Sequence, residues 1–167
     1  EETEGPTELR LELPVQARIP ESYIDSERLR LEAYQKLSAA ASATASEEAI
    51  DLVLEELTDR YGTPPEEVAG LVSVARLRRR AAQAGLADVV AMEPNLRIAP
   101  AHLPDSMRVR LQRLYPKAKL VSNGDALVVP LPAAAGAGQA DADLLRWVGQ
   151  LLDQLWPQKT DAEKTPA

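Results

Sequence analysis

Few side chains in this sequence are suited to covalent or metal chemistry. The 167 residues include no cysteine and a single histidine, His102, which excludes disulfides, thiolate nucleophiles and cysteine-bound zinc. A serine hydrolase would have to use His102, but the turn PAHLP around it is more typical of an ordinary surface or capping histidine. The acids Glu47, Glu48, Asp51 and Glu55 are spaced as a solvated helix face. We therefore expect no catalytic residue and no metal site.

Nucleotide-binding loops are also missing from the sequence. Neither GxxxxGK[ST] nor GxGxxG occurs, so no glycine-rich loop presents its amides to a phosphate beside a lysine. The glycines of GAGQAD at 136–141 have no lysine after them and are typical of a linker. We expect the chain to use no cofactor and to bind no ATP through such loops.

The formal charge is unevenly distributed along the chain. The total is −7, made up of −9 over residues 1–63, +5 over residues 64–120 and −3 over residues 121–167. An acidic protein repels a phosphate backbone on average, but a basic segment can still contact one. The basic segment could equally complement its own acidic neighbours.

Arginines account for most of this basic segment. At 100° per residue, Arg76, Arg79 and Arg80 share one strip of the helix that contains ARLRRRAAQ. Arg110 and Arg113 lie on the shorter helix that follows. The candidate contacts to nucleic acid or to an acidic partner are Arg76, Arg79, Arg80, Arg110 and Arg113. No aromatic residue lies among the arginines of the strip, so we favour their pairing with an acidic helix over residues 46–61.

A second charged group lies on that acidic helix. With Ile50 placed at 0°, the apolar stripe of the helix lies between about −60° and +40°, whereas Asp59, Glu56 and Arg60 lie at about 180°, 240° and 280°. The three residues therefore form one contiguous patch outside the core. Glu56 and Arg60 are spaced i, i+4, so simple support of the helix is one interpretation and a protein interface is the other.

Hydrophobic periodicity predicts the elements of the first half. LRLELPV at 9–15 alternates as a half-buried strand does, and its prolines place it at a sheet edge or end it. Three consecutive helices follow. The first is capped by Asp25 or Ser26, the second covers 46–61, and the third is capped by Thr63 in a capping box and ends at Gly85.

The period changes after Gly85. ADVVAME and LRIAPA predict two strands, and a short helix runs from Asp105 or Ser106 to Tyr115. KLVS and ALVVPL flank Asn123-Gly124, a strong hairpin signal. A flexible connection at 133–140 leads to an amphipathic helix through 144–155.

These elements predict an α+β fold, with a small, mainly antiparallel sheet packed against about five helices, three of them consecutive near the N-terminus. We expect one domain over 8–156, a linker over 1–7 and a disordered tail over 157–167. No apolar run is long enough to cross a bilayer and the first residues do not form a signal peptide, so the sequence indicates a cytoplasmic protein without membrane contact.

Four motifs carry a resemblance to a known family. They are LPVxAxIPxxYI at 13–24, RLxxYxKL at 30–37, ELxDRYGxxPxEV at 56–68 and ARLRxxA at 75–81. In this order and at this spacing they resemble the C-terminal regulatory domain of bacterial transcription-repair coupling factors. The resemblance is dense over residues 8–85 and weaker beyond.

This resemblance implies a role within a longer protein. Coupling factors recognise stalled RNA polymerase, move on double-stranded DNA by a superfamily-2 motor that uses ATP, and recruit UvrA for nucleotide excision repair. In that family the C-terminal domain is autoinhibitory, because it packs on a UvrB-like N-terminal module and hides the surface that UvrA uses. Charged residues of the ELxDR segment take part in this clamp, and they match Glu56, Asp59 and Arg60. The alternative function is an accessory domain that binds the DNA backbone through the arginine strip.

Overall fold

The computed structural model describes residues 9–132 and 140–157. The predicted linker at 1–7 lies outside these residues, as do almost all of the predicted connection at 133–140 and the predicted tail at 157–167. The elements are β1 (Arg10–Glu12), α1 (Glu27–Ala40), α2 (Ala49–Tyr61), α3 (Glu66–Gln83), β2 (Asp88–Met92), β3 (Asn95–Ala99), α4 (Asp105–Leu114), β4 (Lys119–Val121), β5 (Ala126–Pro130) and α5 (Ala140–Leu155).

The five strands form one mixed sheet in the order β1-β2-β3-β5-β4. β1 pairs with β2 in parallel, and every other pair is antiparallel. The sheet is therefore mainly antiparallel, as predicted, and β1 lies at an edge, as its prolines indicated. Because side chains alternate along each strand, residues that are paired across neighbouring strands point to the same face of the sheet. One such row of paired residues is entirely apolar. This row consists of Leu11, Val89, Ile98, Leu127 and Leu120.

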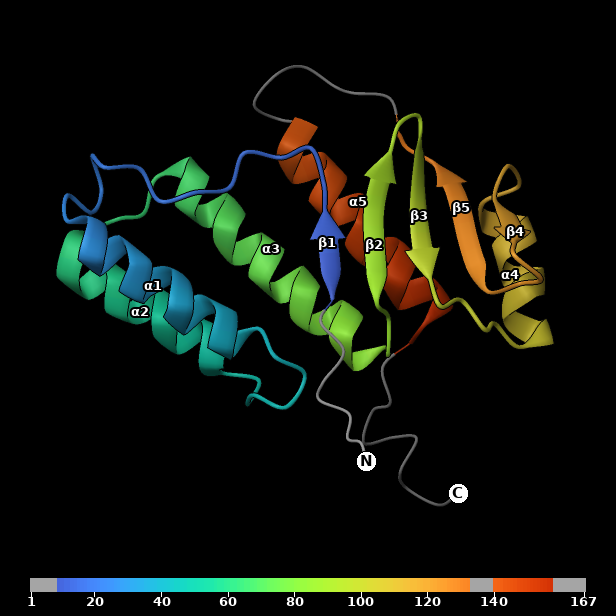
Figure 1. The fold of residues 1–167 in the computed structure, drawn as a ribbon, viewed down its shortest axis with the longest axis horizontal. Coiled ribbons are helices and arrows are strands. Elements are labelled where there is room, and N and C mark those ends of the chain that lie inside the picture. Colours follow the sequence, from blue (N-terminus) through green and yellow to red (C-terminus); the bar gives the residue numbers. More distant parts are fainter. Residues whose placement is uncertain (1–8, 133–139, 158–167) are drawn as a thin grey trace.

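Helix α5 packs on that apolar face and completes the main core. It runs diagonally behind the sheet in Figure 1. Leu151 and Leu152 are fully buried and belong to the same cluster as Leu96, Ile98 and the other inward strand residues. The predicted amphipathic helix is confirmed, because its leucines face the sheet.

Helices α1 and α2 form a hairpin that packs on the far side of α3 from the sheet (Figure 1). Two smaller clusters hold this hairpin, one around Ile50 and Val72 and the other around Leu57 and Val68. Helix α3 also supplies Leu77 to the main core. It is therefore the element that joins the hairpin to the sheet.

Helix ends follow the sequence signals in part. The Ser26 hydroxyl accepts a hydrogen bond from the Leu29 amide at 3.3 Å, which confirms the predicted cap of α1. The predicted capping box at Thr63 is wrong: α3 is capped by Pro65, in extended backbone and without a side-chain hydrogen bond. The helix consequently begins at Glu66, because the residue before a proline is disfavoured in the helical region and both prolines precede the first turn.

Two other predicted starts shift by a few residues. Helix α2 begins at Ala49 rather than Ser46, which instead closes a turn by accepting the Ala49 amide at 3.2 Å through its carbonyl. Helix α4 is capped by Pro104 rather than by Asp105 or Ser106. Gly85, at φ +81°, follows the end of α3 as expected of a residue that tolerates left-handed backbone.

Gly149 offers a test of packing in α5. A Cβ atom placed there would meet no other atom within 4 Å, and glycine inside a helix costs about 0.5 to 1 kcal/mol relative to alanine. We expect Gly149→Ala to raise the thermal unfolding midpoint and Gly85→Ala, at a positive φ, to lower it. A lower midpoint for Gly149→Ala would contradict the open surroundings of this residue.

Candidate interdomain interface

Helix α2 separates its two faces sharply. Ile50 and Leu57 are buried at 2% and 4% exposure. Asp59 lies on the exposed side turned away from them, whereas Glu56 and Arg60 flank the groove between α1 and α2, where their side chains are exposed by 39% and 47%. The structure thus places the three predicted interface residues next to one another on α2, from the groove against α1 to the outer face of the helix.

The carboxylate of Glu56 lies between two cations. Its Oε2 atom accepts a hydrogen bond from Lys36 Nζ on α1 at 2.7 Å, and Arg60 NH1 lies 3.5 Å from the same oxygen. The Arg60 guanidinium also stands 5.2 Å from the centre of the Tyr61 ring, within the range of a cation–π contact. Lys36 could not be predicted as a partner of Glu56, because it is 20 residues away along the chain and reaches Glu56 only through the packing of α1 on α2.

Asp59 differs from Glu56 in its surroundings. Its side chain is exposed, and within residues 9–132 and 140–157 it makes no hydrogen bond or ion pair. Its carboxylate is therefore open to a partner, whereas that of Glu56 is already engaged inside the domain. We refer to Lys36, Glu56, Asp59 and Arg60 as the hairpin charge cluster.

The hydrogen bond from Lys36 is the main cause that lowers the pKa of Glu56 below its ordinary value, with further contributions from the charges of Lys36 and Arg60. A carboxylate with a lowered pKa stabilises the fold above its unfolded pKa, and this stability is lost as the pH falls through the folded value. We expect an NMR titration to give a Glu56 pKa below the usual glutamate range and Lys36→Met to raise it. An unchanged pKa in Lys36→Met would rule out the contact.

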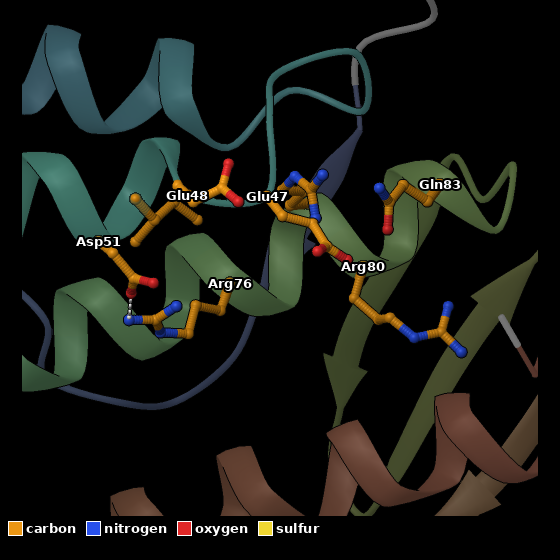
Figure 2. Close-up of a pocket in the computed structure, with 8 residues that line it drawn as sticks. Glu47, Glu48, Asp51, Arg76, Arg80 and Gln83 are labelled. Carbon is orange, nitrogen blue, oxygen red and sulfur yellow. Dashed lines mark hydrogen bonds and ion pairs between the residues drawn. The ribbon is translucent and has the colours of Figure 1, made fainter. Parts of the chain in front are cut away.

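The strip on α3 is largely tied to other elements of the domain. Arg76 NH2 lies 2.6 Å from Asp51 Oδ1 on α2, and Figure 2 shows the two side chains pointing toward one another. Arg79 NH2 donates to the Ala45 carbonyl at 3.0 Å. Arg80 points away toward α5 (Figure 2), where its Nε donates to Asp153 Oδ1 at 2.8 Å. A shallow pocket of about 360 Å³ lies among these groups.

Two of the candidate arginines converge on the C-terminal end of α5. Arg80 NH2 donates to the carbonyls of Leu152 and Trp156, and Arg110 NH1 donates to the Gln154 carbonyl at 2.9 Å. The last carbonyls of a helix lack partners inside the helix and carry partial negative charge. These arginines therefore act as caps for α5. Arg113 lies on the exposed side of α4, apart from the strip.

His102 shows no arrangement for catalysis. Its Nε2 atom lies 3.2 Å from Asp125 Oδ1, and both side chains are more than half exposed. The backbone of the neighbouring Ala101 also bonds to Asp125, so this contact ties two loops together. Across the described part of the chain, no group of three or more His, Cys, Asp or Glu residues could hold a metal ion, and none of its helices has the length and apolar character needed to span a membrane.

Comparison with known proteins agrees with the resemblance. The family model described as the TRCF domain matches residues 13–108. The transcription-repair-coupling factors of Mycobacterium bovis and Mycobacterium tuberculosis are each 42% identical over 156 residues, or 91% of this chain. That of Staphylococcus epidermidis is 33% identical over 86 residues. The chain spans 12% of the length of the mycobacterial proteins.

The fold also has a solved counterpart. The crystal structure of the C-terminal domain of transcription-repair coupling factor superimposes with a TM-score of 0.66, covering 91% of this chain and 96% of that one at 19% sequence identity. The α+β architecture is therefore that of the coupling-factor domain. From the family match and the identity to the mycobacterial proteins, this chain belongs to the TRCF domain family of transcription-repair coupling factors.

Proposed function

We propose that this chain is the autoinhibitory domain of a coupling factor and that it masks a UvrB-like N-terminal module from UvrA until the motor engages stalled RNA polymerase. The observation that carries the proposal is the exposed surface of α2, where Asp59 lies on the helix face opposite the buried Leu57 and Arg60 is exposed beside the groove between α1 and α2. Family membership supplies the context, and the structure supplies a polar surface that the fold itself leaves uncovered.

A polar surface suits a reversible contact. Exposed ion pairs are individually worth about 0 to 1 kcal/mol, so a few of them bind weakly between separate molecules. They become sufficient when both partners belong to one chain, because a tether raises their effective concentration to the millimolar range. A competing conformation that is a few kcal/mol better can then release the clamp.

The remaining functions belong to the proposed parent protein. We infer that the chain works within a longer cytoplasmic protein whose motor uses ATP and moves on double-stranded DNA. RNA polymerase and UvrA are partners of that parent, and the UvrB-like module is the intramolecular partner of this domain. The domain itself contributes contacts and no chemistry, in keeping with the sparse set of reactive side chains.

The direct test of this proposal is to remove the domain from the full-length protein. We expect the truncated protein to bind UvrA more tightly than the intact one, because the UvrB-like module is no longer covered. The control is the isolated UvrB-like module, which should bind UvrA as tightly as the truncated protein does. Equal UvrA affinity of the intact and truncated proteins would contradict an autoinhibitory role.

DNA binding through the arginines is the weaker alternative. Arg76, Arg80 and Arg110 donate to atoms of the domain itself, and a guanidinium held this way must give up these contacts to reach phosphates. We therefore expect the purified chain to show no micromolar affinity for double-stranded DNA at physiological salt. Micromolar binding that weakens steeply as the salt concentration rises would instead support the alternative.

A further inference from the structure

Within the hairpin charge cluster, one carboxylate oxygen of Glu56 contacts cations from two helices. Lys36 comes from α1, whereas Glu56 and Arg60 lie on α2. Glu56 Oε2 is 2.7 Å from Lys36 Nζ and 3.5 Å from Arg60 NH1. One carboxylate oxygen thus faces a cation from each helix, and the three side chains carry a net charge of +1.

This arrangement limits what Glu56 can offer to a partner. A cation of another protein would compete with two cations that already surround the carboxylate. Arg60, in contrast, has its guanidinium fixed on one side by Glu56 and placed 5.2 Å from the Tyr61 ring, so its side chain loses less freedom when it binds. Asp59 remains open. The surface that reaches outward is therefore the adjacent pair Asp59 and Arg60.

We propose that Lys36 is a positioning residue of the inhibitory surface: it anchors Glu56 across the helical hairpin, Glu56 holds the guanidinium of Arg60, and Asp59 and Arg60 make the contacts with the partner. This inference rests on the proposed function and names a residue and a division of roles within it. The complementary partner surface offers a cation to Asp59 and a carboxylate or carbonyl oxygen to Arg60.

A purely structural role for Lys36 predicts different behaviour. If Lys36 only held α1 against α2, any comparable bridge to α2 would have the same effect on UvrA binding. Arg76 supplies the matched case, since its 2.6 Å contact with Asp51 also links α2 to another helix but lies away from the cluster. Arg76→Met therefore removes an interhelical bridge and leaves the inhibitory surface intact.

The test measures UvrA affinity of the full-length coupling factor carrying Lys36→Met, Lys36→Arg, Arg76→Met or the triple change Glu56→Ala, Asp59→Ala and Arg60→Ala. The triple variant should bind UvrA more tightly than wild type, because it loses the contacts proposed to cover the UvrB-like module. We expect Lys36→Met to raise the affinity at least about threefold, within the range by which single residues modulate coupled sites. Lys36→Arg should stay close to wild type, because it preserves the cation, and Arg76→Met should not change the affinity.

The outcomes separate this inference from the proposed function. If the triple variant binds UvrA more tightly and Lys36→Met does not, Lys36 has no positioning role while the clamp stands. If Lys36→Met and Arg76→Met raise the affinity equally, the effect is general loosening of the hairpin and the inference is overturned. If the triple variant itself leaves the affinity unchanged, the clamp fails, and the role of Lys36 fails with it.

Discussion

Replacing Leu57 with alanine is expected to lower the free energy of unfolding by about 2 to 5 kcal/mol, the usual cost of truncating a buried leucine. Leu57 is only 4% exposed and packs in the cluster that contains Ile19, Ile24 and Val68. This cluster joins α2 to α3 and to the segment before α1. Truncating Leu57 should therefore loosen the packing of the whole α1–α2 hairpin.

The matched control for Leu57 lies on the same helix. Leu52 is 60% exposed, so Leu52→Ala removes the same atoms from a position that buries little surface. Surface substitutions usually change stability by less than about 0.5 kcal/mol. Urea unfolding of the two variants measures the difference, and equal losses would contradict the separation of buried and exposed faces described for α2.

The second large effect is expected on binding rather than on stability. The triple change Glu56→Ala, Asp59→Ala and Arg60→Ala removes three exposed or partly exposed charges of α2, and alanine is the best helix former. All three residues lie outside the hydrophobic clusters. The thermal midpoint of the domain should therefore stay within about two degrees of wild type, since the change removes only exposed contacts.

In the full-length coupling factor, the same triple change should substantially raise the affinity for UvrA. When only a fraction f of the full-length protein adopts the conformation that can bind UvrA, the apparent dissociation constant for UvrA is the intrinsic one divided by f. Minor conformations of switch proteins are commonly populated at about 0.1 to 10%. Opening the clamp fully should then tighten UvrA binding by about tenfold or more.

Much of the fold could be predicted because local patterns and tertiary packing agree. The alternation of β1, the leucines of α5 and the Asn123-Gly124 turn all mark elements that the structure contains. Asn123 and Gly124 adopt φ values of 59° and 86°, the left-handed backbone that such residues tolerate. The start of α3 was mispredicted, because a capping box requires Thr63 to lie next to the first turn and two prolines move that turn forward.

The outward surface of α2 could be predicted from helical geometry alone. Glu56, Asp59 and Arg60 lie outside the apolar stripe, and a regular helix preserves this angular relation over two turns. What could not be predicted is the involvement of Lys36. Its meeting with Glu56 depends on how two helices pack, and no spacing within either helix encodes that contact.

The partners of the arginine side chains could not be predicted from the sequence. Helical periodicity put Arg76 and Arg80 on one strip, but their long side chains extend to different neighbours, Asp51 on α2 and the end of α5. Arg80 is only 12% exposed. A charge pattern read from sequence cannot separate a guanidinium that caps a helix from one that faces a ligand, because both are cations on a helix surface.

The measurement that tests the inhibitory role most directly is a binding titration of UvrA against the full-length coupling factor, wild type and triple variant side by side. Circular dichroism should first show that the triple variant of the domain unfolds at the wild-type temperature. We expect the triple variant then to bind UvrA at least about tenfold more tightly than wild type. A triple variant that folds normally and binds UvrA with wild-type affinity would show that Glu56, Asp59 and Arg60 do not mask the surface that UvrA uses.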